Sequence, residues 1–183
     1  MALSHAILAI VLNGPMTGYD LAKRFSKRSG YIWRATHQQI YRELAKLEQN
    51  GFLEPVEEGS DIRSDRVPRS ITRSGREHLL EWVVLSNEPA SIKDEILVKC
   101  MTLGLASAEQ VARAIADRRA QQEERLAFYR STIDGKYQDP RSLEGEALGS
   151  YLALSGGIRY ETAWIAWADE ALDLLRALRL RTC

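Results

Sequence analysis

The stretch from residue 36 to residue 50, THQQIYRELAKLEQN, gathers side chains that can hydrogen-bond to nucleic acid. Amide, imidazole and guanidinium groups match the edges of bases in a DNA groove, and arginine also neutralises phosphates. Apolar residues recur every three or four positions, which is typical of an amphipathic helix with one buried stripe. The polar face would then be exposed and would carry His37, Gln38, Gln39, Tyr41 and Arg42.

Signals at both ends of this stretch predict where the helix begins and ends. The hydroxyl of Thr36 can accept a hydrogen bond from an unpaired amide of the first turn. Ile40, Leu44 and Leu47 form the apolar stripe. Gly51 can adopt the left-handed backbone conformation that is common just beyond a helix C-terminus. The sequence therefore predicts a short surface helix, whose function depends on its neighbours.

The preceding residues predict two more helices. Residues 2–12 form an apolar run that favours a buried helix, although a strand would also fit. Asn-Gly-Pro at 13–15 ends this run, and Thr17 can cap a second helix over about 18–27. Three short helices, the last with an exposed polar face, are the order expected of a helix-turn-helix module.

Residues 52–58 and 67–72 can form the two strands of a β-hairpin. A hairpin after the third helix predicts a winged helix-turn-helix, with Pro68 at a strand start or edge. The hairpin carries three arginines, Arg63, Arg66 and Arg69, and we expect at least one of them to contact a phosphate. The alternative is that they are the ordinary surface charges of a solvated hairpin.

The chain beyond the wing predicts a second, helical domain. Ser74 can cap a helix over 75–85, and the segment 86–89 ends it, so we place the domains at 1–87 and 88–183. A helix is expected over about 93–103, with four apolar residues inside: Ile96, Leu97, Cys100 and Met101. Ser107 and Gln110 resemble a capping box for a helix to about 136.

The last helix is expected over about 142–180, with Gly156-Gly157 as a kink or a close-packing point. Two long amphipathic helices joined by a tight turn have more apolar face than they can cover for each other. We predict that this antiparallel helical domain dimerises with a second copy. The alternative is a monomer in which the helices fold back on the N-terminal domain.

Composition excludes several classes of protein. The chain has 183 residues, of which 45% are hydrophobic and 27% charged, with a net charge of zero, as is ordinary for a globular protein. Cys100 and Cys183 lack the spacing of a zinc site or a disulfide framework. We expect no metal, no cofactor and no enzymatic activity, because no motif for catalysis or phosphate binding is present. We also expect a cytoplasmic protein without a membrane span.

Several segments together resemble the PadR family of bacterial transcriptional regulators. They are ILAIVLNGPMTGYDLAKRF at 7–25, QQIYRELAKLEQNGFL at 38–53, ITRSGREHLLEWV at 71–83, IKDEILVKCM at 92–101 and YETAWIAWADEALDLL at 160–175. The resemblance implies a mainly α protein with a β-hairpin wing, a dimeric repressor of double-stranded operator DNA. It places Thr36 and the third helix in the major groove, and Tyr19 near a phosphate. Arg69 stands where the family usually has an aromatic residue, which leaves the contacts of the wing open.

Aromatic residues suggest that the regulator responds to an effector. Members of the resembled family include repressors that release DNA on binding phenolic or planar hydrophobic molecules. A pocket for a small aromatic effector would use Trp82, Tyr151, Trp164 and Trp167. The alternative is core packing, since Trp164 and Trp167 are three residues apart on one helix. The competing function for the whole chain is a winged-helix protein-interaction module without operator binding.

Overall fold

The computed structural model describes residues 2–25, 35–56, 67–88 and 94–182. The chain forms two compact units, Met1–Glu88 and Pro89–Cys183. Each unit has its own hydrophobic core, so each is described by itself.

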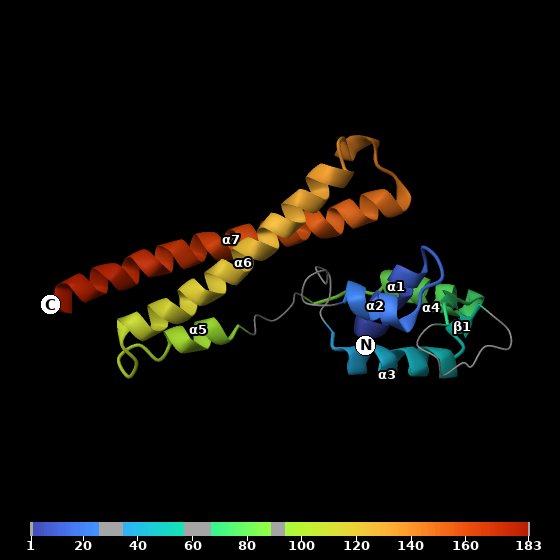
Figure 1. The fold of residues 1–183 in the computed structure, drawn as a ribbon, viewed down its shortest axis with the longest axis horizontal. Helices are drawn as coiled ribbons and strands as arrows, with labels where there is room; N and C mark the ends of the chain where they lie inside the picture. The colour runs from blue at the N-terminus through green and yellow to red at the C-terminus, as the bar shows by residue number, and fades with distance from the viewer. Residues whose placement is uncertain (1, 26–34, 57–66, 89–93, 183) are drawn as a thin grey trace. The chain divides into compact units, whose positions relative to one another are not determined.

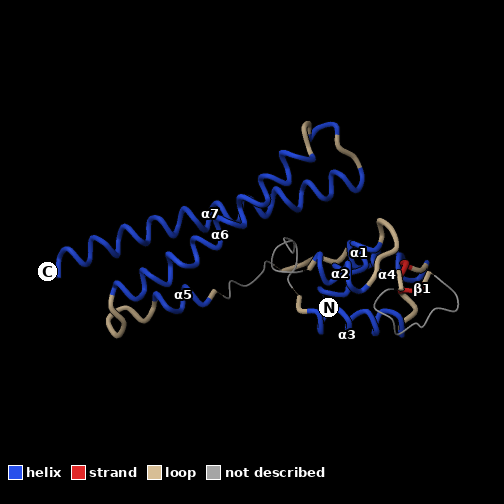
Figure 2. The backbone as a smooth tube through the Cα atoms, in the orientation of Figure 1, coloured by secondary structure: helices blue, strands red, loops and turns tan. Residues whose placement is uncertain are grey.

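The described residues of the N-terminal unit form four helices and one two-stranded sheet (Figures 1 and 2). In chain order they are α1 (Ala2–Val11), α2 (Gly18–Arg24), α3 (His37–Gln49), β1 (Leu53–Pro55), β2 (Arg69–Ile71) and α4 (Arg73–Val83). The first apolar run is therefore a helix and not a strand. The predicted second and third helices are confirmed, with α2 ending at Arg24 instead of near residue 27.

Side-chain caps decide where these helices begin. Thr17 Oγ1 accepts the amide hydrogen of Asp20 at 3.0 Å, and Thr36 Oγ1 accepts that of Gln39 at 3.2 Å. Ser74 was predicted to cap the fourth helix, but Thr72 is its N-cap and accepts the amide hydrogen of Gly75 at 3.0 Å. The prediction was wrong because the last extended residue is Thr72, so the helix begins at Arg73 and Ser74 already lies in its first turn.

The predicted hairpin is confirmed as an antiparallel pair in which Leu53 lies opposite Ile71. Its strands are shorter than the sequence indicates, with three residues each. The apolar stripe of α3, Ile40, Leu44 and Leu47, is buried in the core together with both of these strand residues. Burial of this stripe fixes which face of α3 remains exposed.

The C-terminal unit is a long helical hairpin with a short helix beside it (Figure 1). Its elements are α5 (Glu95–Cys100), α6 (Ala108–Lys136), a 3-10 turn (Pro140–Ser142) and α7 (Gly145–Thr182). The capping box of α6 is present as predicted, since the Ser107 hydroxyl accepts the Gln110 amide hydrogen and the Gln110 side chain accepts that of Ser107. The helices α6 and α7 pack along each other.

Two local predictions for this unit have different outcomes. Met101 and Leu97 were expected inside, but Met101 is 85% exposed and Leu97 is 38% exposed. Met101 lies beyond the end of α5 at Cys100, and within α5 only Ile96 is buried. Close packing at the Gly156-Gly157 pair is confirmed for Gly157, where an added Cβ would lie 3.1 Å from the ring of Tyr129.

A polar layer crosses the α6–α7 interface. Gln122 is fully buried, and its two amide atoms have no hydrogen-bond partner among the described residues. Nearby, Arg125 Nη1 donates to Glu161 Oε1 at 2.9 Å, and Glu161 is only 2% exposed. Buried polar groups cost free energy unless they are paired, so an alignment of the two helices that separated Arg125 from Glu161 would be disfavoured.

Candidate nucleic-acid interface

The exposed face of α3 carries the side chains that the sequence singled out. His37, Gln38 and Arg42 are exposed, and Arg42 forms no ion pair with any other described residue. A free guanidinium on a helix surface can bind a phosphate or the edge of a guanine. Figure 1 shows α3 along one edge of the N-terminal unit, and α1 and α2 pack against the inner side of α3.

Two of the predicted contact residues also have structural roles. The Thr36 side chain caps α3, and Gln39 Oε1 accepts the backbone hydrogen of Thr36 at 2.9 Å. The Gln39 amide nitrogen therefore remains available as a donor. The ring of Tyr41 is half-buried over Gly18, where an added Cβ would lie 2.5 Å from Tyr41 Cε1. Tyr41 thereby fixes the packing of α2 against α3.

The helix α2 adds an aromatic residue and two basic residues. Tyr19 is 60% exposed at its first turn, and Lys23 and Arg24 are exposed at its last turn. Basic groups beside a polar helix face favour a polyanion. Three further basic residues that follow in the sequence, Lys27, Arg28 and Arg34, lie outside the described residues.

The prediction that Arg69 contacts DNA is contradicted by its burial. Arg69 is 7% exposed, and its Nε forms an ion pair with Glu48 Oε1 at the end of α3. Its Nη1 donates to the Val67 carbonyl at 2.9 Å, and its backbone exchanges two hydrogen bonds with Met16. The guanidinium is already occupied inside the unit, so it is not offered to a phosphate. The other wing arginines, Arg63 and Arg66, lie outside the described residues.

Two exposed residues of α3 were missed by the sequence reasoning. Ala45 and Gln49 are exposed and follow Gln38 and Arg42 at helical spacing, so they share the same face. A glutamine can bind the edge of an adenine, and a small alanine can contact a thymine methyl group. The helical repeat could have identified both, had it been continued past Arg42.

The aromatic residues proposed for an effector are already packed in separate clusters. Trp82 ends a stack of four rings, in which Phe52 and His78 lie 4.4 Å apart, His78 and His5 5.2 Å, and His5 and Trp82 4.4 Å. In the C-terminal unit, Trp164 Nε1 donates to Asp94 Oδ2 at 2.9 Å.

The remaining candidates lie along α7. Trp164 and Trp167 are in edge contact at 5.4 Å, whereas Tyr151 contacts Tyr137 at 5.9 Å. Tyr151 and Trp164 are thirteen residues apart on one helix, a rise of about 20 Å. Within one protomer, Tyr151 and the two tryptophans therefore do not line one small pocket.

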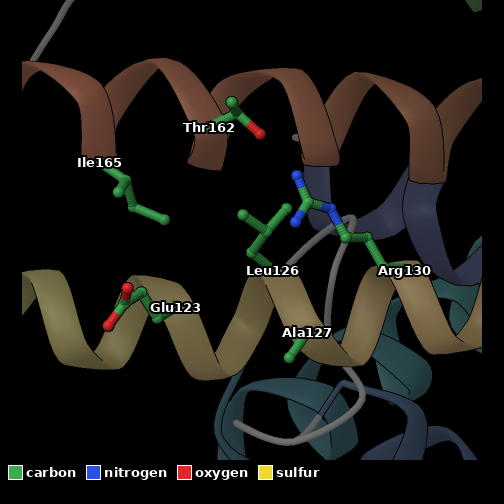
Figure 3. A pocket seen from close by; sticks show the side chains of 6 residues that line it. All are labelled: Glu123, Leu126, Ala127, Arg130, Thr162 and Ile165. Carbon is green, nitrogen blue, oxygen red and sulfur yellow. The ribbon is translucent and has the colours of Figure 1, made fainter.

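A shallow groove of about 370 Å³ lies on the α6–α7 hairpin (Figure 3). Four residues of α6 and two of α7 line it: Glu123, Leu126, Ala127, Arg130, Thr162 and Ile165. Figure 3 shows that Leu126 lies between Glu123 and Arg130 along α6, with the guanidinium reaching toward α7. Among the described residues, no group of His, Cys, Asp and Glu could hold a metal ion.

The fold and its exposed third helix define the class: the N-terminal unit is a winged helix-turn-helix. Residues 7–81 match the model of the transcriptional regulator PadR-like family, and residues 92–176 match that of the virulence activator alpha C-terminal region. A probable transcriptional regulator of Mycobacterium tuberculosis (strain ATCC 25618 / H37Rv), Rv1176c, is 35% identical over 98% of this chain and 100% of its own length.

Two further relatives match over nearly their full lengths. The structure of the Vibrio cholerae virulence activator AphA has a TM-score of 0.77 and 34% identity, covering 96% of this chain and 99% of that one. The negative transcriptional regulator PadR of Bacillus subtilis is 26% identical over 94% of this chain and 97% of its own. Its solved structures include complexes with operator DNA and with p-coumaric acid, at TM-scores of 0.74 and 0.73.

The chain belongs to the PadR family and is a transcriptional regulator with the family's longer C-terminal region. The relatives are regulators and not enzymes, so the protein is not an enzyme. Across the ranges that the structure describes, none of the helices combines the length and the apolar character needed to cross a membrane.

Proposed function

We propose that this regulator binds double-stranded operator DNA through the exposed face of α3. The observation that carries the proposal is the surface formed by His37, Gln38 and Arg42 on a helix whose other face is locked in the core. Such a helix can enter the major groove, where its amide and guanidinium groups would read base edges. Tyr19 and the basic end of α2 would contact the neighbouring phosphates.

We further propose that residues 88–183 are a dimerisation domain and residues 1–87 the DNA-binding domain. Described residues of the C-terminal unit leave large apolar side chains exposed on α6 and α7, such as Phe128 at 40%, Leu152 at 58% and Tyr160 at 59%. A second copy would cover such surface. Two α3 helices related by a two-fold axis could then reach successive major grooves, about 34 Å apart.

The proposed mode of action is repression that a small aromatic or hydrophobic effector relieves. Support comes from the Bacillus relative, which is a negative regulator whose structure has been solved with p-coumaric acid. The Vibrio relative is an activator, so the sign of regulation requires a transcription measurement. The effector residues remain the four aromatics Trp82, Tyr151, Trp164 and Trp167. In one protomer, Tyr151 and the Trp164–Trp167 pair would have to act in separate places.

The first experiment is a mobility-shift titration on the DNA upstream of the gene, with unrelated DNA as competitor. We expect a competitor-resistant shift whose affinity falls steeply with salt, because phosphate contacts release counterions. R42A should weaken binding by about tenfold, since a guanidinium–guanine pair contributes about 1–3 kcal/mol, without changing the melting temperature. R73A is the matched control, because Arg73 is an exposed helical arginine that pairs with Glu77 at 2.9 Å.

The competing function is a winged-helix module that binds a protein. It predicts that the triple variant Q38A/Q39A/R42A keeps its partner, and that no genomic fragment survives competition. Genome-wide footprinting would distinguish this result from a wrong choice of operator. Failure of all fragments with the wild-type protein, both with and without p-coumarate, would refute operator binding.

A further inference from the structure

The polar layer of the α6–α7 hairpin contains hydrogen-bonding groups that the described residues leave unused. Gln122 is 0% exposed, and neither its Nε2 nor its Oε1 has a hydrogen-bond partner among the described residues. One turn earlier on α6, Arg118 Nε is also buried without a partner there. Side chains four residues apart lie next to each other on a helix, with their Cβ atoms about 5–6 Å apart. Native proteins leave few buried polar groups unpaired, so we expect a bound molecule at this layer.

The charges on either side of Gln122 favour a negatively charged molecule. On one side, Arg125 Nη1 donates to Glu161 Oε1 at 2.9 Å, so a carboxylate of the chain offsets that arginine. On the other side, Arg118 forms no ion pair with any other described residue. A partly buried arginine without a counter-ion is costly, and a bound anion would supply one.

The neighbours of Arg118 across the helix interface do not supply that counter-ion. The guanidinium carbon of Arg118 lies 6.0 Å from the centre of the Trp164 ring, a cation–π distance. The Asp94 carboxylate beside Trp164 is already in use. Its Oδ2 accepts from Trp164 Nε1 at 2.9 Å, and its Oδ1 accepts the amide hydrogen of Ile96 at 3.0 Å.

We propose that Arg118 and Gln122 bind the carboxylate group of a small acid between α6 and α7 of one protomer. The Nε hydrogen of Arg118 and the amide hydrogens of Gln122 would donate to the two carboxylate oxygens, which have acceptor sites for all of them. Such charge-assisted hydrogen bonds are stronger than neutral ones. A companion water would donate to Gln122 Oε1. The link of this site to regulation rests on the effector response proposed above, whereas binding itself does not.

The surroundings of the site allow two sources of the carboxylate. Solvent reaches the helix interface one turn from Gln122, at the groove that Leu126 and Ile165 line (Figure 3). Arg118 is half-buried, so its side chain forms the rim of the site. A small aliphatic acid would use the polar groups alone. An aromatic acid would add contact between its ring and the half-buried Trp164.

Calorimetric titration of the full-length protein with benzoate, at constant ionic strength, tests the site. We expect saturation at one benzoate per chain, with acetate as a competitor. Benzamide has the same shape without the charge, so it should not bind. R118M and Q122L should each raise the Kd of benzoate at least tenfold, which is the loss expected for one hydrogen bond to a charged group. R113M is the matched control, because Arg113 is on α6 with 71% of its side chain exposed.

The variant Q122L separates loss of the site from loss of the fold. Leucine removes an unpaired buried amide, so without ligand Q122L should melt at the temperature of the wild type or higher.

The relative affinities identify the source of the carboxylate. Acetate that binds as tightly as benzoate would indicate a small aliphatic acid, and much tighter benzoate an aromatic acid, and both results support the site. No saturable binding of either acid, or binding that both R118M and Q122L leave unchanged, would overturn it. Operator release is read separately in the mobility shift: benzoate that binds at this site without changing the shift would refute its role in regulation and leave the site intact.

Discussion

The buried ion pair between Arg69 and Glu48 predicts a large loss of stability when one partner is neutralised. Arg69 lies on β2 and its side chain is 8% exposed, whereas Glu48 lies at the end of α3 with 23% exposure. In E48Q the buried guanidinium would lose its anionic partner, while its hydrogen bond to the Val67 carbonyl at 2.9 Å would remain. Glutamine keeps the size of the side chain, so the change removes charge and not volume.

The magnitude follows from how buried the pair is. Removing one partner of a fully buried pair costs about 3–5 kcal/mol, and the partial exposure of Glu48 reduces this to about 2–3 kcal/mol. For a unit of this size, each kcal/mol lowers the melting temperature by about 4–8 °C, so a drop of about 10 °C or more is expected. R69M alone should cost similarly, and the double variant E48M/R69M should recover much of the loss.

The assay is thermal and urea unfolding of the wild type and the variants, with E43Q as the matched control. Glu43 is on the same helix and lies 3.6 Å from Lys46, whose side chain is 57% exposed. Such a pair contributes at most about 0.5 kcal/mol, so E43Q should melt nearly as the wild type does. If E48Q and E43Q melt at the same temperature, the ion pair does not hold the wing strand to α3.

Three further outcomes are expected. Gly75→Ala would place a methyl group 2.3 Å from the Phe52 carbonyl oxygen, so the free energy of unfolding measured in urea should fall by about 2 kcal/mol or more. In the control Gly156→Ala the new methyl group meets open space, so this free energy should be unchanged or higher. Gly18→Ala must displace Tyr41, so operator affinity should fall several-fold in the mobility-shift titration. The melting temperature should fall less than it does in Gly75→Ala. An unchanged affinity would show that the position of Tyr41 is unimportant for binding. Burial, followed by the negative charge of Asp94, raises the pKa of the Cys100 thiol. In the C183S variant, the reaction of Cys100 with a thiol reagent should therefore reach half its maximal rate at a higher pH in the folded protein than in the urea-unfolded chain. Equal midpoint pH values in the two states would contradict this prediction.

The sequence by itself determined the features that depend on neighbouring residues. The N-cap at Thr36, the capping box at Ser107 and the apolar stripe of α3 each join residues only a few positions apart, so their side chains meet whenever the helix forms. The order of three helices and a hairpin followed from the same signals. These local features were sufficient to identify a winged helix-turn-helix and its exposed face.

Only the tertiary structure decided which charged and aromatic groups remain available. Arg69 reads as a surface arginine of a wing, but Glu48, twenty-one residues away, pairs with it inside the unit. The sequence fits Trp164 equally well as a pocket residue or a core residue. The structure shows that its indole N–H donates a hydrogen bond to Asp94, seventy residues away. Thr72 and Ser74 are both good caps, and the hydroxyls of both donate to the Gly51 carbonyl, twenty-one and twenty-three residues away. The extended backbone lies at Thr72, which makes Thr72 the cap. Such pairings join residues far apart in the chain, so they depend on how the elements pack and leave no periodic trace in the sequence.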